Sequence, residues 1–352
     1  MRLAISGLIC MAWLNAAVQP QSPAPLRLLQ TLTMDKGVTG RFDHMAVDVQ
    51  GGRLFLTAAD HHSIQILDLK SGKWMRTITG LRKPAGIVYV PETDRVLFSD
   101  GARSCNILDA ATYKIVGTVK LADDADSVGF DRDANILFVV NGGRDAKETF
   151  SRLTIVDTKN QKSLGEIRID VDRVEAMALE TGGPRLFINV TALNKVAVLN
   201  RTTRQLITTW DLPGAKENVS MAFDEAGHRL FVATRSPGRL IVLNSDTGKA
   251  VASLPAAGGV DDLAYDAAHK RIYLSAGDGF VNVYQQKTPD TYEAFARMPT
   301  GPGARNSRFV PEQNRLYVAV PAGKDGNRRR FRSTKSASNT RHRNSQREAT
   351  GP

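Results

Sequence analysis

The sequence predicts an all-β fold: a seven-bladed β-propeller with four-stranded blades, closed into a ring by an N-terminal strand in the last blade. Three observations lead to this fold class. A unit of 40 to 50 residues recurs along most of the 352-residue chain, as is typical of propeller blades. Short segments rich in Val, Ile, Leu and Phe alternate with turn residues, as strands do. The chain also lacks a convincing amphipathic helix, which excludes a doubly wound α/β fold.

The recurring unit is marked by a turn followed by Arg or Asn and an apolar pair. Successive marks are 42, 40, 50, 44, 42 and 44 residues apart, and the long third interval contains the insertion GGRDAKETFSR. A further apolar segment follows each mark except the last, as in IQILDL and LIVLN. The marks open the predicted second strands of the blades, at Arg53, Arg95, Asn135, Arg185, Arg229, Arg271 and Arg315.

Each unit is predicted to contain four short strands separated by turn clusters of Gly, Asp, Ser and Lys. In the first unit these strands are HMAVDV, RLFLTA, SIQILDL and WMRTITGL, with the inner strand at His44–Asp48. The N-terminal segment Leu28–Thr33 resembles the fourth strand of this unit, so we expect it to be the outer strand of the last blade. Pairing the start of the chain with its end would close the ring without an unpaired edge.

Three of these segments carry a resemblance to a known family. The opening RFDHMAVD, the unit DDLAYDAAHKRIYLSAGDGFVNVY and the closing GARNSRFVPEQNRLYVAVP resemble the secreted YncE-like, YVTN-repeat β-propeller proteins of bacteria. The resemblance covers about Leu26 to Pro321 and implies the propeller fold. It implies no single activity, because propellers carry many unrelated functions. DNA binding within the family makes nucleic acid one of the partners that the resemblance allows.

The chain is predicted to have three parts. Residues 1–18, with Arg2 before the apolar run Leu3 to Val18, are typical of a signal peptide. This indicates a secreted or periplasmic protein without stable membrane insertion after cleavage; a membrane anchor is the alternative, although the run is short for one. Residues 19–321 form the predicted propeller. After cleavage Cys105 is the only cysteine, which excludes an internal disulfide and argues against a cysteine-based zinc site.

Residues 322–352 are expected to form a disordered basic tail. The tail carries nine Lys or Arg and two Asp or Glu, whereas the body between Arg2 and the tail carries 37 basic and 34 acidic residues. The net charge of +11 therefore belongs mostly to the tail, and the body gives no basic surface that would indicate nucleic-acid binding.

The tail begins where the last predicted blade is still incomplete. The third strand of the seventh unit would fall near Arg330, where Phe331 is the only apolar residue nearby, so the last blade is expected to lack it. A break in the middle of a blade favours a shifted reading frame over a native ending. The alternatives are a basic arm that binds nucleic acid or anionic surfaces, and an arm without a role.

Polar residues are expected to ring one mouth of the central channel, where the inner strands begin. Positions five residues before the ends of these strands are carboxylates in four cases, Asp43, Asp126, Glu175 and Asp261. With their neighbours, the predicted ligand-binding residues are Asp43, His44, Asp126, Glu175, Asn218, Asp261, Asp262, Arg305 and Asn306. No catalytic residue is assigned. The structural alternative is that these residues cap turns at strand starts and pair with arginines.

Oxygen ligands from several blades would suit Ca²⁺ or Mg²⁺, with Asp43, Asp126, Glu175 and Asp261 as the candidate metal ligands. A similar arrangement in gluconolactonase-type propellers uses a metal to polarise a lactone carbonyl. Three histidines, His44, His61 and His62, either form a transition-metal site near Asp43 or belong to a solvated polar region. The insertion at 142–152 either folds over the mouth as a lid or is a surface loop.

These observations leave three hypotheses about function. The first is an exported propeller that binds or scaffolds a small polar ligand or a protein partner at the channel mouth. The second is a metal-assisted lactonase-like hydrolase. The third is nucleic-acid binding, against which the nearly neutral body argues. The sequence contains no GxSxG, HExxH or phosphate-loop motif, but propeller hydrolases assemble their sites from single residues on separate blades, so this does not exclude an enzyme.

Overall fold

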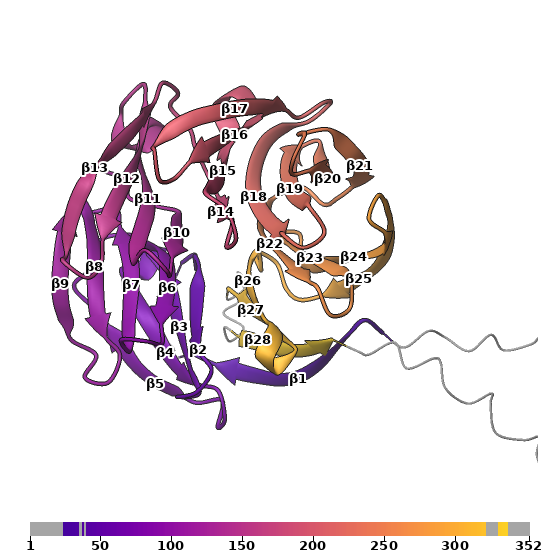
Figure 1. Ribbon diagram of the computed structural model, residues 1–352. Coiled ribbons are helices and arrows are strands. Elements are labelled where there is room, and N and C mark those ends of the chain that lie inside the picture. Colours follow the sequence, from indigo (N-terminus) through magenta and orange to yellow (C-terminus); the bar gives the residue numbers. More distant parts are fainter. Residues whose placement is uncertain (1–23, 35–36, 39, 322–329, 337–352) are drawn as a thin grey trace, which may run out of the picture.

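The structure of the protein is a computed structural model that describes residues 24–34, 37–38, 40–321 and 330–336. In this part of the chain the regular structure is mainly β-strand, and the helices are four single 3₁₀ turns: η1 (Ala59–His61), η2 (Arg144–Ala146), η3 (Thr191–Leu193) and η4 (Pro311–Gln313). Within the described ranges no helix is long and apolar enough to span a membrane. The predicted all-β propeller is confirmed, because four-stranded sheets are arranged in a ring (Figure 1).

Six blades are each built from four consecutive strands, ordered from the channel to the outer edge. The first three blades contain β2 (Met45–Asp48), β3 (Arg53–Ala58), β4 (Ser63–Asp68) and β5 (Trp74–Ile78); β6 (Pro84–Val90), β7 (Arg95–Asp100), β8 (Ser104–Asp109) and β9 (Ile115–Lys120); and β10 (Val128–Asp131), β11 (Ile136–Gly142), β12 (Ser151–Asp157) and β13 (Lys162–Ile169). The next three contain β14 (Met177–Leu179), β15 (Arg185–Val190), β16 (Lys195–Asn200) and β17 (Gln205–Asp211); β18 (Lys216–Asp224), β19 (Arg229–Ser236), β20 (Gly238–Asn244) and β21 (Ala250–Pro255); and β22 (Val260–Asp266), β23 (Arg271–Ala276), β24 (Phe280–Thr288) and β25 (Thr291–Pro299).

A further four-stranded sheet joins the two ends of the chain. Its order is β26 (Asn306–Val310), β27 (Arg315–Val320), β28 (Arg330–Ser336) and β1 (Leu26–Thr33). The predicted outer strand at the N-terminus is confirmed, since β1 pairs antiparallel with β28 at the edge of this sheet. The ring therefore consists of six continuous blades and this composite sheet, rather than of seven blades that are alike.

The expectation that the last unit lacks a third strand is wrong. Strand β28 occupies that place and pairs antiparallel with β27 on one side and with β1 on the other. The physical reason is that backbone hydrogen bonding does not require apolar side chains, so a polar segment can form a strand between two partners. The predicted disorder is therefore wrong for 330–336, whereas the rest of the predicted tail and the predicted signal peptide at 1–18 lie outside the described residues.

The hydrophobic core is divided into clusters that lie between neighbouring sheets. Each second strand of a sheet supplies one aromatic ring that is at most 2% exposed: Phe55, Phe98, Phe138, Phe187, Phe231, Tyr273 and Tyr317. One cluster packs β1 and β27 against β3 and β4, so the composite sheet covers a face of the first blade. Another packs it against the last continuous blade. Because each blade buries its faces on its neighbours, the packing extends around the ring.

Four of the arginines that mark the sequence repeat connect neighbouring blades. Arg53 is bonded to Asp48 in its own blade, with Nη2 2.6 Å from Oδ2, and crosses to Asp94 and to the carbonyl of Ala110 in the next blade. Arg185 likewise pairs with Glu180 and crosses to Asp246, 3.0 Å away.

The same connection recurs at the following blades. Arg229 donates to the carbonyl of Pro289 and pairs with Asp290. Arg271 is 1% exposed and donates to the carbonyl of Pro25, directly before β1. At the one mark that is not arginine, Asn135, the neighbouring blade supplies the connection instead, through the ion pair of Arg201 with Asp131 at 2.6 Å.

Closure of the ring can be tested with two leucines of the same strand. Leu32 is completely buried in the cluster between the composite sheet and the first blade, whereas Leu28 is 51% exposed. We expect Leu32→Ala to lower the free energy of unfolding by about 3 kcal/mol, through lost burial and a residual cavity, and Leu28→Ala to change it by less than about 0.5 kcal/mol. Chemical denaturation measures both. Equal effects would show that β1 does not close the ring.

The inter-blade role of the repeated arginine can be tested at Arg185. Arg185→Met leaves the buried carboxylate of Glu180 without its ion-pair partner, so we expect a loss of about 2 kcal/mol of unfolding free energy. The double variant with Glu180→Gln should lose less unfolding free energy than the sum of the single variants, because no unpaired buried carboxylate then remains. Arg103→Met is the control: Arg103 pairs with Asp123 at an exposed site and should matter little. Equal losses at the two arginines would contradict the inter-blade role.

Candidate functional site

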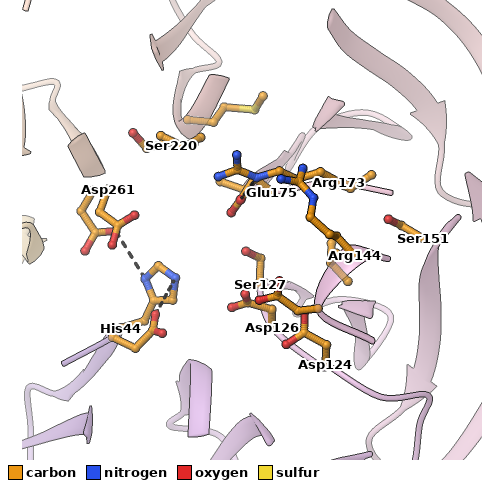
Figure 2. Close-up of a pocket in the computed structure, with 18 of the residues that line it drawn as sticks. His44, Asp124, Asp126, Ser127, Arg144, Ser151, Arg173, Glu175, Ser220 and Asp261 are labelled. Carbon is orange, nitrogen blue, oxygen red and sulfur yellow. Dashed lines mark hydrogen bonds and ion pairs between the residues drawn. The ribbon is translucent and has the colours of Figure 1, made fainter. Parts of the chain in front are cut away.

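A polar cavity of about 440 Å³ lies at the end of the central channel where the inner strands begin. Its wall comes from the segments that lead into these strands, including Arg41–His44 before β2, Asp124–Ser127 before β10 and Asp172–Ala176 before β14. Because these segments belong to different blades, the ring brings together residues that are far apart in the sequence. Figure 2 shows His44, Asp126 and Glu175 around one common space. We call this space the mouth cavity.

The charged residues of the mouth cavity are of both signs, with an excess of acids. The wall contains eight carboxylates, six Lys or Arg and one His. The carboxylates are Asp43, Asp124, Asp126, Asp145, Asp172, Glu175, Asp261 and Asp262, and the bases are Arg41, Lys83, Arg144, Arg173, Arg235, Arg305 and His44. A site of this composition suits a charged or strongly polar occupant rather than an apolar one.

Seven of the nine residues predicted to bind a ligand line this cavity: Asp43, His44, Asp126, Glu175, Asp261, Asp262 and Arg305. The other two lie behind its wall. Asn218 is completely buried and donates to Asn189 Oδ1 at 2.8 Å, and Asn306 is 3% exposed and donates to Asp261 Oδ2 at 3.3 Å. These two asparagines therefore support the wall, and binding by the other seven remains a prediction.

His44 connects the first blade to the sixth. Its Nε2 lies 3.4 Å from Asp43 Oδ1, and its Nδ1 lies 3.3 Å from Asp262 Oδ1. Burial alone would lower the pKa of His44, but the Asp262 and Asp43 carboxylates raise that pKa well above its ordinary value. The imidazole is therefore held as a cation between two carboxylates. Asp262 is fixed in turn by the backbone N–H of Ser307, which donates to its Oδ2 at 2.7 Å.

Two arginines of the cavity are bonded to carboxylates of its wall. Arg235 pairs with Asp261 at 2.5 Å and donates to the carbonyl of Val260. Arg173 donates to Glu175 Oε1 at 2.9 Å. Such pairs fix the positions of the carboxylates in the wall, because a guanidinium holds its partner in a defined geometry.

Two carboxylates carry perturbed pKa values on the opposite side of the cavity. Burial, with the nearby Asp126 carboxylate, raises the pKa of Glu175 to about 7, although Arg173 and Arg235 oppose this shift. Burial also raises the pKa of Asp126, although the Lys83 ammonium opposes it. Desolvation and like charges both disfavour the ionised form. In a concave site, such perturbed groups mark a candidate functional site.

Asp43 responds to the acids of several blades. Burial raises the pKa of Asp43; His44 opposes the shift, while Asp126, Asp261 and Asp262 add to it. These residues come from the first, third and sixth blades, so the acids are near enough to repel one another across the cavity. The four predicted carboxylates Asp43, Asp126, Glu175 and Asp261 all line the mouth cavity.

The candidate metal ligands do not form a coordination site. Among the residues that the structure describes, no three His, Cys, Asp or Glu side chains lie close enough together to hold a metal ion. Three of the four predicted ligands are paired with cationic side chains instead: Asp43 with His44, Glu175 with Arg173, and Asp261 with Arg235. A Ca²⁺ or Mg²⁺ site built from these four carboxylates alone is therefore not formed, because three of them are held by cationic side chains.

The histidine cluster considered from the sequence is not formed either. His61 Nδ1 lies 2.7 Å from Ser63 Oγ, and His62 Nδ1 is bonded to the carbonyl of Arg82. Neither ring is part of the cavity wall, whereas His44 is. The loop interpretation of His61 and His62 is the one that agrees with these contacts.

Several residues of the wall were missed by sequence reasoning. Arg235 lies at the end of the second strand β19, and Lys83 lies directly before β6. In an antiparallel sheet, the end of the second strand lies beside the start of the first, so counting along both strands would have found Arg235. Arg144 and Asp145 of the insertion also line the cavity, and Arg144 Nε pairs with Asp172 Oδ2 at 3.2 Å. The insertion therefore borders the mouth, as the lid interpretation requires.

The fold and the cavity define a β-propeller with a charged site at one end of its channel. No protein-family model and no curated protein sequence matches the chain. Among solved structures, hydrazine synthase of Kuenenia stuttgartiensis is similar, with a TM-score of 0.71 and 15% sequence identity over 84% of this chain and 97% of that chain. At this sequence identity the structural similarity supports the propeller fold and indicates nothing about activity. Membership of the YncE-like family stays a prediction.

The acidic wall predicts an unusual dependence of stability on pH. Groups whose pKa is raised by folding stabilise the protein below their unfolded pKa of about 4, and this contribution is lost as the pH rises through the folded pKa. We expect the double variant Asp126→Asn, Glu175→Gln to melt at a temperature similar to that of the wild type at pH 4 and about 2 °C higher at pH 8. Differential scanning calorimetry of the unliganded protein measures the difference.

The matched control for this experiment is Asp170→Asn, whose carboxylate is 80% exposed outside the cavity. It should not show a difference that grows with pH. A double variant that is less stable than the wild type at pH 8 would show that the acids are not crowded.

Proposed function

We propose that the protein is an exported β-propeller that binds a small polar ligand in the mouth cavity and acts by binding rather than by catalysis. The observation that carries the proposal is the cavity itself: about 440 Å³, lined by charged residues of six blades and by Arg305 of the composite sheet. Concave sites of this size, with converging polar groups and perturbed pKa values, are the places where proteins hold small molecules.

Two alternatives are less well supported. A metal-assisted hydrolase needs a bound ion, and the described residues bring no three His, Cys, Asp or Glu side chains together to hold one. Nucleic-acid binding needs a basic surface, whereas the wall of the mouth cavity has more acids than bases. A protein partner could dock at the same end of the channel, but a small molecule matches the size of the cavity better. Export rests on the apolar N-terminal segment of the sequence, and placement among the YncE-like propellers rests on the sequence resemblance.

The proposal can be tested by blocking the cavity. Asp145 lines the mouth cavity and is 69% exposed at its rim, so Asp145→Trp should cover the entrance without disturbing the core. We expect at least one compound from a panel of anionic, cationic, zwitterionic and neutral polar molecules to raise the melting temperature of the wild type. The shift should disappear in Asp145→Trp and persist in the control Asp170→Trp, which places the same side chain outside the cavity. If no compound gives this pattern, the mouth cavity is not a binding site.

A further inference from the structure

The carboxylates of the mouth cavity act on one another electrostatically, although they do not form a group that could bind a metal ion. The carboxylates of Asp43, Asp126 and Asp261 come from three different blades and line the same cavity. Asp126 and Asp261 raise the pKa of Asp43, and Asp261 raises that of Asp126. Yet no three acidic or histidine side chains among the described residues are close enough to hold one metal ion. The negative charge is therefore spread over a space larger than a single ion fills. An occupant that balances it must carry its positive charge on a molecule of several atoms.

The acids are also less completely paired than the bases. Among the described residues the Asp126 carboxylate has no hydrogen bond and no ion pair; Lys83 acts on it only through space. Asp43 is paired with His44 alone, at 3.4 Å. In contrast, Arg235 is bonded to Asp261 and Val260, and Arg173 to Glu175. Among the acids of the wall, Asp126 is thus the carboxylate most available to a ligand, and among the bases it is Arg305, whose Nε is 4.0 Å from Asp261.

The wall also contains an uncharged hydrogen-bonding group, the hydroxyl of Ser220. Ser220 lines the cavity and is drawn among its residues in Figure 2. It is only 2% exposed, and within the described ranges its Oγ has no hydrogen-bond partner. Buried hydroxyls usually have a partner, so this one is available for a further hydrogen bond. The hydroxyl can accept a hydrogen bond from an N–H donor.

We propose that the ligand of the mouth cavity is a small organic cation with protonated amines, of the diamine or polyamine class, held between Asp126, Asp43 and Glu175. This inference rests on the proposed function, since it names the ligand class of the same site. One ammonium group lies beside the unpaired Asp126 carboxylate, and a second charge, several bonds away, lies beside Asp43 or Glu175. A flexible diamine can reach separated carboxylates that a single metal ion cannot bridge.

The proposal excludes two other ligand chemistries. An anion would have to displace the carboxylates that occupy Arg235 and Arg173, and it would meet the excess of acids in the wall. A bare divalent cation would need several oxygens within about 2.6 Å of it, and no three of the described acidic or histidine side chains converge on one point to supply them. An ammonium group needs only one or two acceptors at hydrogen-bond distance.

The experiment compares molecules of one length and different charge by isothermal titration calorimetry at pH 7.5 and low salt. The probes are putrescine, butanediol, succinate and Mg²⁺. We expect putrescine to bind and the other three to bind at least about tenfold more weakly. Asp126→Asn should weaken putrescine binding at least about tenfold, which corresponds to the loss of a charge-assisted contact. The control Asp170→Asn removes a carboxylate that is 80% exposed outside the cavity and should bind like the wild type.

A second readout is the dependence of putrescine affinity on pH. The cation binds the ionised acids, so its affinity should rise as the pH increases from 5 to 8 and these groups lose their protons. Glu175→Gln should flatten this rise without abolishing binding. The charged groups that act on the two acids are Lys83, Asp124, His44 and Asp261 around Asp126, and Asp126, Arg173 and Arg235 around Glu175.

The outcomes separate this inference from the proposed function. If succinate or Mg²⁺ binds more tightly than putrescine, and Asp145→Trp abolishes that binding, the cavity is a ligand site and the cation inference is wrong. If putrescine binds equally well to Asp126→Asn, the Asp126 carboxylate does not recognise its ammonium group, and the inference is again wrong. If no probe and no compound of the panel shows binding that Asp145→Trp removes, the proposed function fails as well.

Discussion

Closure of the ring between the two ends of the chain is the constraint on which the rest of the structure depends. Strand β1 pairs with β28, and Leu32 of β1 packs into the cluster that covers the first blade. A blade with one uncovered face would expose an apolar surface, and an open sheet edge would expose unpaired backbone groups. Closure removes both costs. It also fixes the relative positions of the inner strands, and hence the shape of the mouth cavity.

Polar contacts between the blades add direction to this packing. Apolar contacts are not directional. An arginine that bonds an acid in its own blade and a turn in the next blade is directional, so it helps to define the orientation of the two blades. Arg53, Arg185 and Arg229 make such contacts, and Arg201 replaces them where the repeat has Asn135. The same residue thus serves as a repeat mark in the sequence and as a geometric connector in the ring.

The mouth cavity differs from the rest of the ring in how its acids are paired. Elsewhere buried acids have partners, as Asp48 has in Arg53. At the mouth, the Asp126 carboxylate has no ion pair among the residues that the structure describes, and acids of other blades raise the pKa values of Asp43 and Asp126. Such an arrangement disfavours the unliganded protein, and binding of an oppositely charged ligand would relieve the repulsion. Local sites that oppose stability in this way are where function is expected.

The sequence by itself determined the propeller fold, the second strands and the outer position of β1, because the repeat and its apolar pattern are local properties of the chain. It also located seven of the nine predicted site residues in the cavity wall, since the alignment of inner strands places equivalent positions at one mouth. It could not show that β28 completes the composite sheet, because partners distant in sequence supply that strand's backbone hydrogen bonds. Nor could it show which acids pair with His44, Arg173 and Arg235. Those pairings depend on distances across the channel, which only the closed ring decides.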